Sequence, residues 1–219
     1  MKHNNFTYKE LLRGGWNKTK ENFSFLLIAM AIYAVVAIIT FSIPFIGQIA
    51  SMLLGIAALT VMLTIAHNRK PDYGDMTKSV TNFMLVLNYF LASLAYGLIV
   101  MLGFIAFILP GIYLAARFQF YVYAIVEHGN MGPIDALKKS WHMTRGIFWK
   151  LFGFSLVSML IIVVSIIPFG LGLLFSIPTI GIAYALLYKH LAEHAHSNAH
   201  GHVEHHPPLA EQTHSATTA

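Results

Sequence analysis

The chain alternates between long apolar runs and short polar segments. Six runs each come close to the ~20 residues that an α-helix needs to cross a ~30 Å hydrocarbon core. The third run is long and the fourth is short, so we expect a tilt or a shifted boundary there. The pattern predicts an all-α, polytopic membrane protein with six transmembrane helices. The runs lie at about Phe23–Ile43, Phe45–Ala66, Phe83–Leu109, Gly111–Val126, Ile147–Ile167 and Gly170–Tyr188.

The six predicted spans form three hairpins, each of which turns at a proline. The turn prolines are Pro44, Pro110 and Pro168. Proline has no amide donor and disfavours helix in the residue before it, so a break is expected at each position. Pro178 lies inside the sixth run, where we expect it to kink the helix.

A basic amphipathic segment precedes the fifth run. When Gly132–Lys150 is placed on a helix, its apolar residues fall near one face and its polar residues largely on the other. We expect a helix at about residues 133–146 to lie on the membrane surface before the chain enters the bilayer. The apolar set is Ile134, Leu137, Trp141 and Phe148, and the polar set is Asp135, Lys138, Lys139, His142 and Arg145.

A similar segment, Tyr8–Phe25, precedes the first run. Thr7 and Glu10 fit a capping box at its start, and Gly14-Gly15 is expected to weaken or bend the helix. The two amphipathic segments match at one offset, which pairs Trp16 with Trp141, Thr19 with Thr144, and Phe23 with Phe148.

This match predicts an internal repeat. Residues 7–66 and 133–190 align as amphipathic helix, span, proline turn and span, and the copies have the same orientation in the membrane. The middle hairpin, preceded by Asp75–Asn82, is a candidate third copy. The alternative is that any two apolar hairpins look alike.

Charge predicts the orientation. The three proline turns contain no Lys, Arg, Asp or Glu, whereas every other connection carries Lys or Arg. The positive-inside rule therefore places both termini in the cytoplasm. We expect residues 1–22 to form a cytoplasmic amphipathic segment, residues 23–190 a membrane domain, and residues 191–219 a disordered, His-rich cytoplasmic tail.

Composition supports a membrane location and narrows the partners. The chain is 57% hydrophobic and only 11% charged, whereas soluble domains carry about 25% charged residues. The absence of cysteine excludes disulfides, thiol catalysis and cysteine-ligated metals. A net charge of +5 could indicate nucleic acid, but the basic residues flank apolar runs. We therefore expect anionic phospholipids as partners, and no nucleic acid.

Arg117 is the only formal charge inside a predicted span, and Gln119 follows it closely. Such residues usually face the bundle interior or water and indicate a functional site. Three roles are open: a structural clamp, a lipid or anion site, and coupling to transport. As a clamp, Arg117 would bind carbonyls freed by a proline, or the amides of Asn88 and Gln48.

The basic segments supply the other candidate binding residues. Lys138, Lys139 and Arg145 are expected to bind anionic headgroups together with Arg117 and Gln119. The alternative is that these charges only determine the topology of the chain in the membrane. Tryptophan is typical of membrane interfaces, so Trp16, Trp141 and Trp149 are predicted interface anchors.

The tail carries closely spaced histidines, and neutral imidazole binds zinc, nickel and copper. The spacing is not that of a closed tetrahedral site, so we expect at most weak metal binding and no resident cofactor. The sequence has no hydrolase motif, no phosphate-binding glycine loop and no pair of intramembrane carboxylates, so we do not expect an enzyme. The tail histidines are His194, His196, His200, His202, His205 and His206.

The stretch Ile108–Phe152 resembles the membrane domain found beside bacterial glycerophosphoryl diester phosphodiesterases and in related six-span proteins of the YciC type. The similarity rests on Leu-Pro-Gly-Ile-Tyr-Leu from Leu109, on Arg117, and on Ala-Leu-Lys-Lys-Ser-Trp from Ala136 with Thr-Arg-Gly-x-Phe-Trp from Thr144. The resemblance implies a multi-pass location in the bacterial inner membrane. The sequence contains no phosphodiesterase domain, so we do not expect that activity here.

Together these patterns favour a non-enzymatic, membrane-organising or lipid-interacting protein. The alternatives are a small-molecule or metal transport component and a membrane anchor for a separately encoded enzyme. A homo-oligomer and a protein partner in the membrane are left open.

Overall fold

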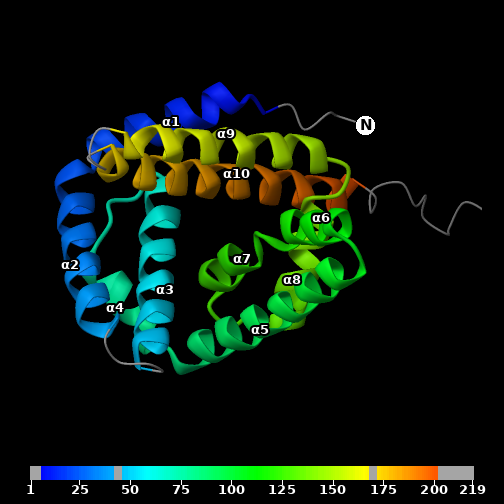
Figure 1. Cartoon of the computed structure of the whole chain (residues 1–219), viewed down its shortest axis with the longest axis horizontal. Helices are drawn as coiled ribbons and strands as arrows, with labels where there is room; N and C mark the ends of the chain where they lie inside the picture. The colour runs from blue at the N-terminus through cyan, green and yellow to red at the C-terminus, as the bar shows by residue number, and fades with distance from the viewer. Residues whose placement is uncertain (1–5, 42–45, 168–171, 202–219) are drawn as a thin grey trace, which may run out of the picture.

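The computed structural model describes residues 6–41, 46–167 and 172–201, and within them it contains α-helices and no strand (Figure 1). The helices are α1 (Tyr8–Glu21), α2 (Phe23–Phe41), α3 (Ile46–Ala66), α4 (Tyr73–Thr81), α5 (Phe83–Ala106), α6 (Ile108–Phe118), α7 (Tyr121–His128), α8 (Pro133–Met143), α9 (Phe148–Ile166) and α10 (Leu173–Gly201). The predicted all-α class is therefore confirmed.

Five segments of the described chain are long and apolar enough to cross a membrane. A sixth is obtained only if α1 and residues Phe23–Val36 of α2, which are bent by 87° to each other, are taken as one span. In Figure 1, α9 and α10 lie side by side, and α2 and α3 run across their direction. The five segments are Gly47–Ala66, Phe83–Ala106, Ile108–His128, Phe148–Ile166 and Leu173–Ala195.

The middle turn does not lie at Pro110. Instead α5 ends before Phe107, whose backbone is extended (φ −169°, ψ 158°), and Pro110 falls in the first turn of α6. Proline is tolerated there because the first amide groups of a helix have no partner within it. A Cβ on Gly111 would lie 2.5 Å from the Phe104 ring, so the glycine permits close packing of α5 on α6. The predicted turns at Pro44 and Pro168 lie outside the described residues.

The C-terminal helix corrects the prediction of a disordered tail from residue 191. It continues through Pro178 as far as Gly201, so residues 191–201 are helical. Leu191 and Ala192 are buried in the main core, and this burial explains why the helix continues past the predicted span. Residues 202–219 lie outside the described part.

The polar helices α1 and α8 each lie along an apolar helix. α1 runs antiparallel to α10, because Phe6 lies against the ring of His190 and Trp16 lies against Phe175. In the same way α8 runs antiparallel to α6 and α7. The shorter helix α4 packs on α3. Each polar helix therefore has one docked face and one free face.

The docked faces of α1 and α8 share one spacing. Leu11, Gly15 and Thr19 are buried in α1, and at the offset of the matched tryptophans Ala136, Ser140 and Thr144 are buried in and just after α8. The hydroxyl of Thr19 donates to the carbonyl of Gly15 (2.9 Å), and the hydroxyl oxygen of Thr144 lies 2.8 Å from the carbonyl oxygen of Ser140. The small residues on these faces allow close approach, and their buried hydroxyls have hydrogen-bond partners.

α1 begins where the sequence predicts, but the predicted capping box does not form at its start. Thr7 is its N-cap residue, yet the Thr7 side chain makes no capping hydrogen bond. Gly14 and Gly15 do not interrupt the helix. A Cβ on Gly15 would collide with the carbonyl oxygen of Thr179 in α10, so this glycine is required by the close approach of the two helices.

We predict opposite effects for two neighbouring alanine substitutions in α1. Gly15→Ala should lower the free energy of unfolding by about 1–3 kcal/mol, because backbone atoms of α10 would have to move. Gly14→Ala meets only the flexible end of Leu186, at 3.2 Å, and should be neutral or stabilising by up to about 1 kcal/mol. Unfolding in detergent micelles measures both. Equal losses would show that helix flexibility, rather than contact with α10, requires glycine here.

Candidate functional site

A break between α6 and α7 leaves backbone groups that α8 satisfies. The helix stops at Phe118 and restarts at Tyr121. The Ser140 hydroxyl accepts from the amide of Phe120 (3.2 Å) and donates to the carbonyl of Arg117 (2.9 Å), and the Thr144 hydroxyl donates to that same carbonyl (3.0 Å). An unpaired buried backbone group would cost about 1–3 kcal/mol, so these contacts fix α8 against the break.

The Arg117 side chain reinforces the same junction. Arg117 is 3% exposed, and its guanidinium donates to the carbonyls of Trp141 (2.8 Å) and Thr144 (3.4 Å). Its central carbon lies 3.9 Å from the centroid of the Trp141 ring. A cation at the carbonyl end of a helix is favourable, and stacking on tryptophan adds to it. The contacts favour the clamp role, but the carbonyls are those at the end of α8, not carbonyls freed by a proline.

The other residues of the predicted lipid or anion site differ in their exposure. Gln119 lies in the break itself, and its amide nitrogen is buried without a partner among the described residues. Lys138 and Arg145 are exposed. Lys139 turns inward instead, with its side chain only 18% exposed. The two predicted lysines therefore lie on different faces of α8, Lys138 on the outer face and Lys139 on the inner face.

The three predicted interface anchors differ in exposure. Trp149 is 79% exposed and Trp16 is 42% exposed, as an anchor requires. Trp141 is partly buried beneath the guanidinium of Arg117 and stacks on Phe118, with ring centroids 5.3 Å apart. Trp141 thus contributes to the docking of α8.

The histidines predicted to bind metal lie at the end of α10 and beyond it. His194 packs against His190, with ring centroids 4.4 Å apart. No group of three or more potential ligands occurs among the described residues. His196 and His200 belong to the end of α10, where only the helix is described, and His202, His205 and His206 lie outside the described residues. The prediction of weak metal binding stays a prediction.

A second polar cluster, absent from the predictions, surrounds the carboxylate of Glu127 at the end of α7. Tyr188 in α10 donates its hydroxyl proton to Oε2 (2.5 Å), and His67 after α3 places Nε2 at 3.5 Å from Oε1. From α8, Lys139 Nζ lies 3.9 Å from Oε2 and 3.1 Å from Nε2 of His128. One carboxylate therefore connects α3, α7, α8 and α10.

Burial changes the acid–base properties of Lys139 in this cluster. Desolvation lowers the pKa of Lys139 below its usual range, and the charge of Glu127 opposes that shift. No sequence pattern indicates the cluster, because Glu127 directly follows a predicted span and resembles an ordinary loop residue. Its partners His67 and Tyr188 are distant in the chain, and without a fold no pattern joins them.

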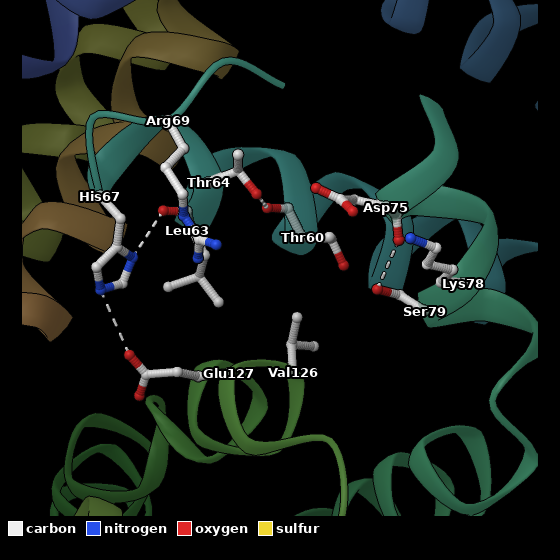
Figure 2. A pocket seen from close by; sticks show the side chains of 10 residues that line it. All are labelled: Thr60, Leu63, Thr64, His67, Arg69, Asp75, Lys78, Ser79, Val126 and Glu127. Carbon is white, nitrogen blue, oxygen red and sulfur yellow. Dashed lines mark hydrogen bonds and ion pairs between the residues drawn. The ribbon is translucent and has the colours of Figure 1, made fainter. Parts of the chain in front are cut away.

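Beside the cluster lies a polar pocket of about 300 Å³, between α3, α4 and α7. Figure 2 shows the Arg69 and Asp75 side chains reaching into it from two sides. Three of its charged side chains, Arg69, Asp75 and Lys78, come from the α3–α4 connection and from α4. The full lining is Thr60, Leu63, Thr64, His67, Arg69, Asp75, Lys78, Ser79, Val126 and Glu127.

Comparison with known families places this arrangement in a wider group. Residues 11–212 match the model of a family described as a domain of unknown function, DUF7847. The chain belongs to the DUF7847 family. No curated protein and no solved structure matches it.

The DUF7847 match begins at Leu11 in α1 and includes every helix from α2 to α10. The break between α6 and α7, the Glu127 cluster and the polar pocket therefore all lie within the family domain. The match assigns no activity to any of them, so the chemistry of the DUF7847 domain has to be inferred from these contacts.

We predict that lysine cannot replace Arg117. Arg117→Lys should lower the free energy of unfolding by about 1–3 kcal/mol, because an ammonium cannot both reach two carbonyls and stack on Trp141. The measurement is thermal or denaturant unfolding of the detergent-purified protein. A lysine variant as stable as the wild type would contradict the clamp.

We also predict that the charge of Glu127 stabilises the fold. Glu127→Gln should lower the free energy of unfolding by about 1.5–3 kcal/mol, since it removes a carboxylate held by several partly buried donors. Glu193→Gln is the matched control, because the Glu193 side chain is 63% exposed against 27% for Glu127, and its one ion pair among the described residues is with Lys189 at 4.0 Å. The control should change stability by less than about 0.5 kcal/mol. Equal effects would contradict a special role for Glu127.

Proposed function

We propose that this DUF7847 protein is a non-enzymatic, multi-pass protein of the bacterial inner membrane that binds the headgroups of anionic phospholipids. In this proposal six apolar segments cross the bilayer as three hairpins, and both termini lie in the cytoplasm. The positively charged connections then lie at the cytoplasmic leaflet, whose anionic lipids attract Lys and Arg.

The division of α8 into two faces carries the proposal. Its inner face, with Ala136 and Ser140, is buried against the helices around the break. Its outer face exposes Lys138, and Arg145 is exposed just beyond the helix. Trp149, 79% exposed, follows at the start of α9. A docked helix with a free basic face beside an exposed tryptophan suits a membrane interface.

α1 repeats this arrangement. Its free face exposes Lys9, Arg13 and Lys20, and Lys20 Nζ lies 5.5 Å from the centroid of the Trp16 ring. The same docked spacing and the same basic free face in α1 and α8 support an internal repeat. We propose that both helices contact the cytoplasmic leaflet.

Transport through a path at Arg117 receives less support. The Arg117 guanidinium is engaged by backbone carbonyls, and Arg117 does not line the polar pocket. The role of membrane anchor for another enzyme rests on the resemblance to phosphodiesterase membrane domains alone.

We predict that neutralising the outer face of α8 weakens anionic lipid binding. Each basic residue near an anionic surface contributes about 1 kcal/mol, so Lys138→Gln combined with Arg145→Gln should lower the affinity for phosphatidylglycerol by about thirtyfold. Native mass spectrometry of protein released from mixed-lipid nanodiscs measures retained lipid.

Two controls accompany that measurement. Lys70→Gln removes an exposed positive charge away from α8 and should have a much smaller effect, and retention of phosphatidylcholine should not change in any variant. Undiminished phosphatidylglycerol retention in the double variant would contradict the proposal and leave the α8 charges as topology determinants only.

A further inference from the structure

The polar pocket between α3, α4 and α7 combines charges that have no partner within the described chain. Among the described residues, no carboxylate lies within 4.0 Å of Arg69 or Lys78, and no cationic group lies within that distance of Asp75. Asp75 and Lys78 share the short helix α4, yet they form no ion pair. Both signs of charge are therefore available to a ligand in one cavity.

The pocket has a charged mouth and a less polar interior. Arg69, Asp75 and Lys78 are exposed, whereas Leu63 and Thr64 are buried. A ligand that enters thus meets charged groups first and keeps contact with water at one end. Its uncharged part can lie against Leu63 and Val126, the two apolar residues of the lining.

The hydroxyl groups that line the pocket already donate their protons, so their oxygens can accept hydrogen bonds from a ligand. Thr60 donates its proton to the carbonyl of Ile56 (2.9 Å), and Thr64 donates to the carbonyl of Thr60 (2.8 Å). Ser79 donates to the carbonyl of Asp75 (3.0 Å). The oxygen of each hydroxyl keeps a free lone pair. Together with the Asp75 carboxylate, these oxygens suit the three donors of a primary ammonium.

The cations suit a phosphate better than a carboxylate. A phosphate monoester carries a charge of about −1.5 to −2 at neutral pH and three acceptor oxygens. The phosphate diester of a lipid headgroup keeps one negative charge and two such oxygens, so either group can use two cationic donors at once. Arg69 offers a planar fork of donors, and Lys78 offers a point charge. Glu127 is already held by His67, Tyr188 and Lys139, which leaves Asp75 as the carboxylate for a cation.

We propose that this pocket binds a small zwitterion that carries a phosphate and a primary ammonium, the chemistry of phosphoethanolamine, either free or as the headgroup of phosphatidylethanolamine. Arg69 and Lys78 bind the phosphate, Asp75 and the wall hydroxyls bind the ammonium, and Leu63 and Val126 contact the carbon atoms between them. This binding differs from the contact of α8 with anionic lipid and does not depend on it.

The first test is isothermal titration of the full-length, detergent-purified protein with phosphoethanolamine, ethanolamine and inorganic phosphate. The intact zwitterion should bind at least tenfold more tightly than either half. Arg69→Gln and Asp75→Asn should each weaken phosphoethanolamine binding at least tenfold. The matched controls Lys70→Gln and Asp135→Asn change the same charges at exposed positions outside the pocket, and they should bind like the wild type.

The second test distinguishes the free compound from the lipid. Native mass spectrometry after transfer from nanodiscs that contain phosphatidylethanolamine measures lipid retention in the same four variants. Retention that falls in Arg69→Gln and Asp75→Asn only, without binding of free phosphoethanolamine, assigns the pocket to the lipid headgroup. Binding of the free compound assigns it to the soluble zwitterion as well.

The proposal is overturned if neither compound binds, or if the pocket variants and their controls behave alike. The outcome is separate from that of the anionic lipid proposal. Phosphatidylglycerol retention depends on Lys138 and Arg145, so it should not change in the pocket variants, and zwitterion binding should survive the α8 double variant.

Discussion

A break inside an apolar helix exposes polar backbone groups where no water can satisfy them, and this fold depends on how α8 satisfies them. Ser140 and Thr144 pair with the backbone of the break, while Arg117 pairs in return with the carbonyls at the end of α8. The exchange is reciprocal, so neither element is fully hydrogen-bonded without the other. It fixes which face of α8 points inward, and therefore which charges point outward.

The docking of α1 on α10 shows that a polar helix can dock in this way without a buried charge. Arg117 and Phe175 each stand seven residues after a proline in the sequence, Pro110 or Pro168. Phe175 stacks on Phe23 and contacts Trp16, with ring centroids 4.8 Å and 5.9 Å away. Where α10 is a continuous helix, an aromatic contact is sufficient. At the break between α6 and α7, the corresponding residue is Arg117, which stacks on Trp141 and also binds the carbonyls at the end of α8.

The sequence predicts those features that repeat locally. The length of the apolar runs and the period of the apolar residues predict most of the helices. The matched tryptophans and threonines locate both docked polar helices. The break at Phe118–Tyr121 was not predictable, because its cause is the pairing with Ser140 and Thr144, which are 20 and 27 residues from their partners along the chain. The Glu127 cluster was not predictable for the same reason, since Tyr188 is 61 residues from Glu127 along the chain. Interactions between distant segments leave no periodic signal.

Lys138 and Lys139 show why a basic segment cannot be interpreted as one surface. Adjacent residues on a helix point in directions about 100° apart, so one lysine is exposed while the other lies beside Glu127 and His128. Burial lowers the pKa of Lys139, and the Glu127 carboxylate opposes this effect. The inner lysine therefore helps to orient α8 through the same carboxylate that borders the polar pocket. The outer charges and the pocket are separate proposed sites, but both depend on how α8 is held.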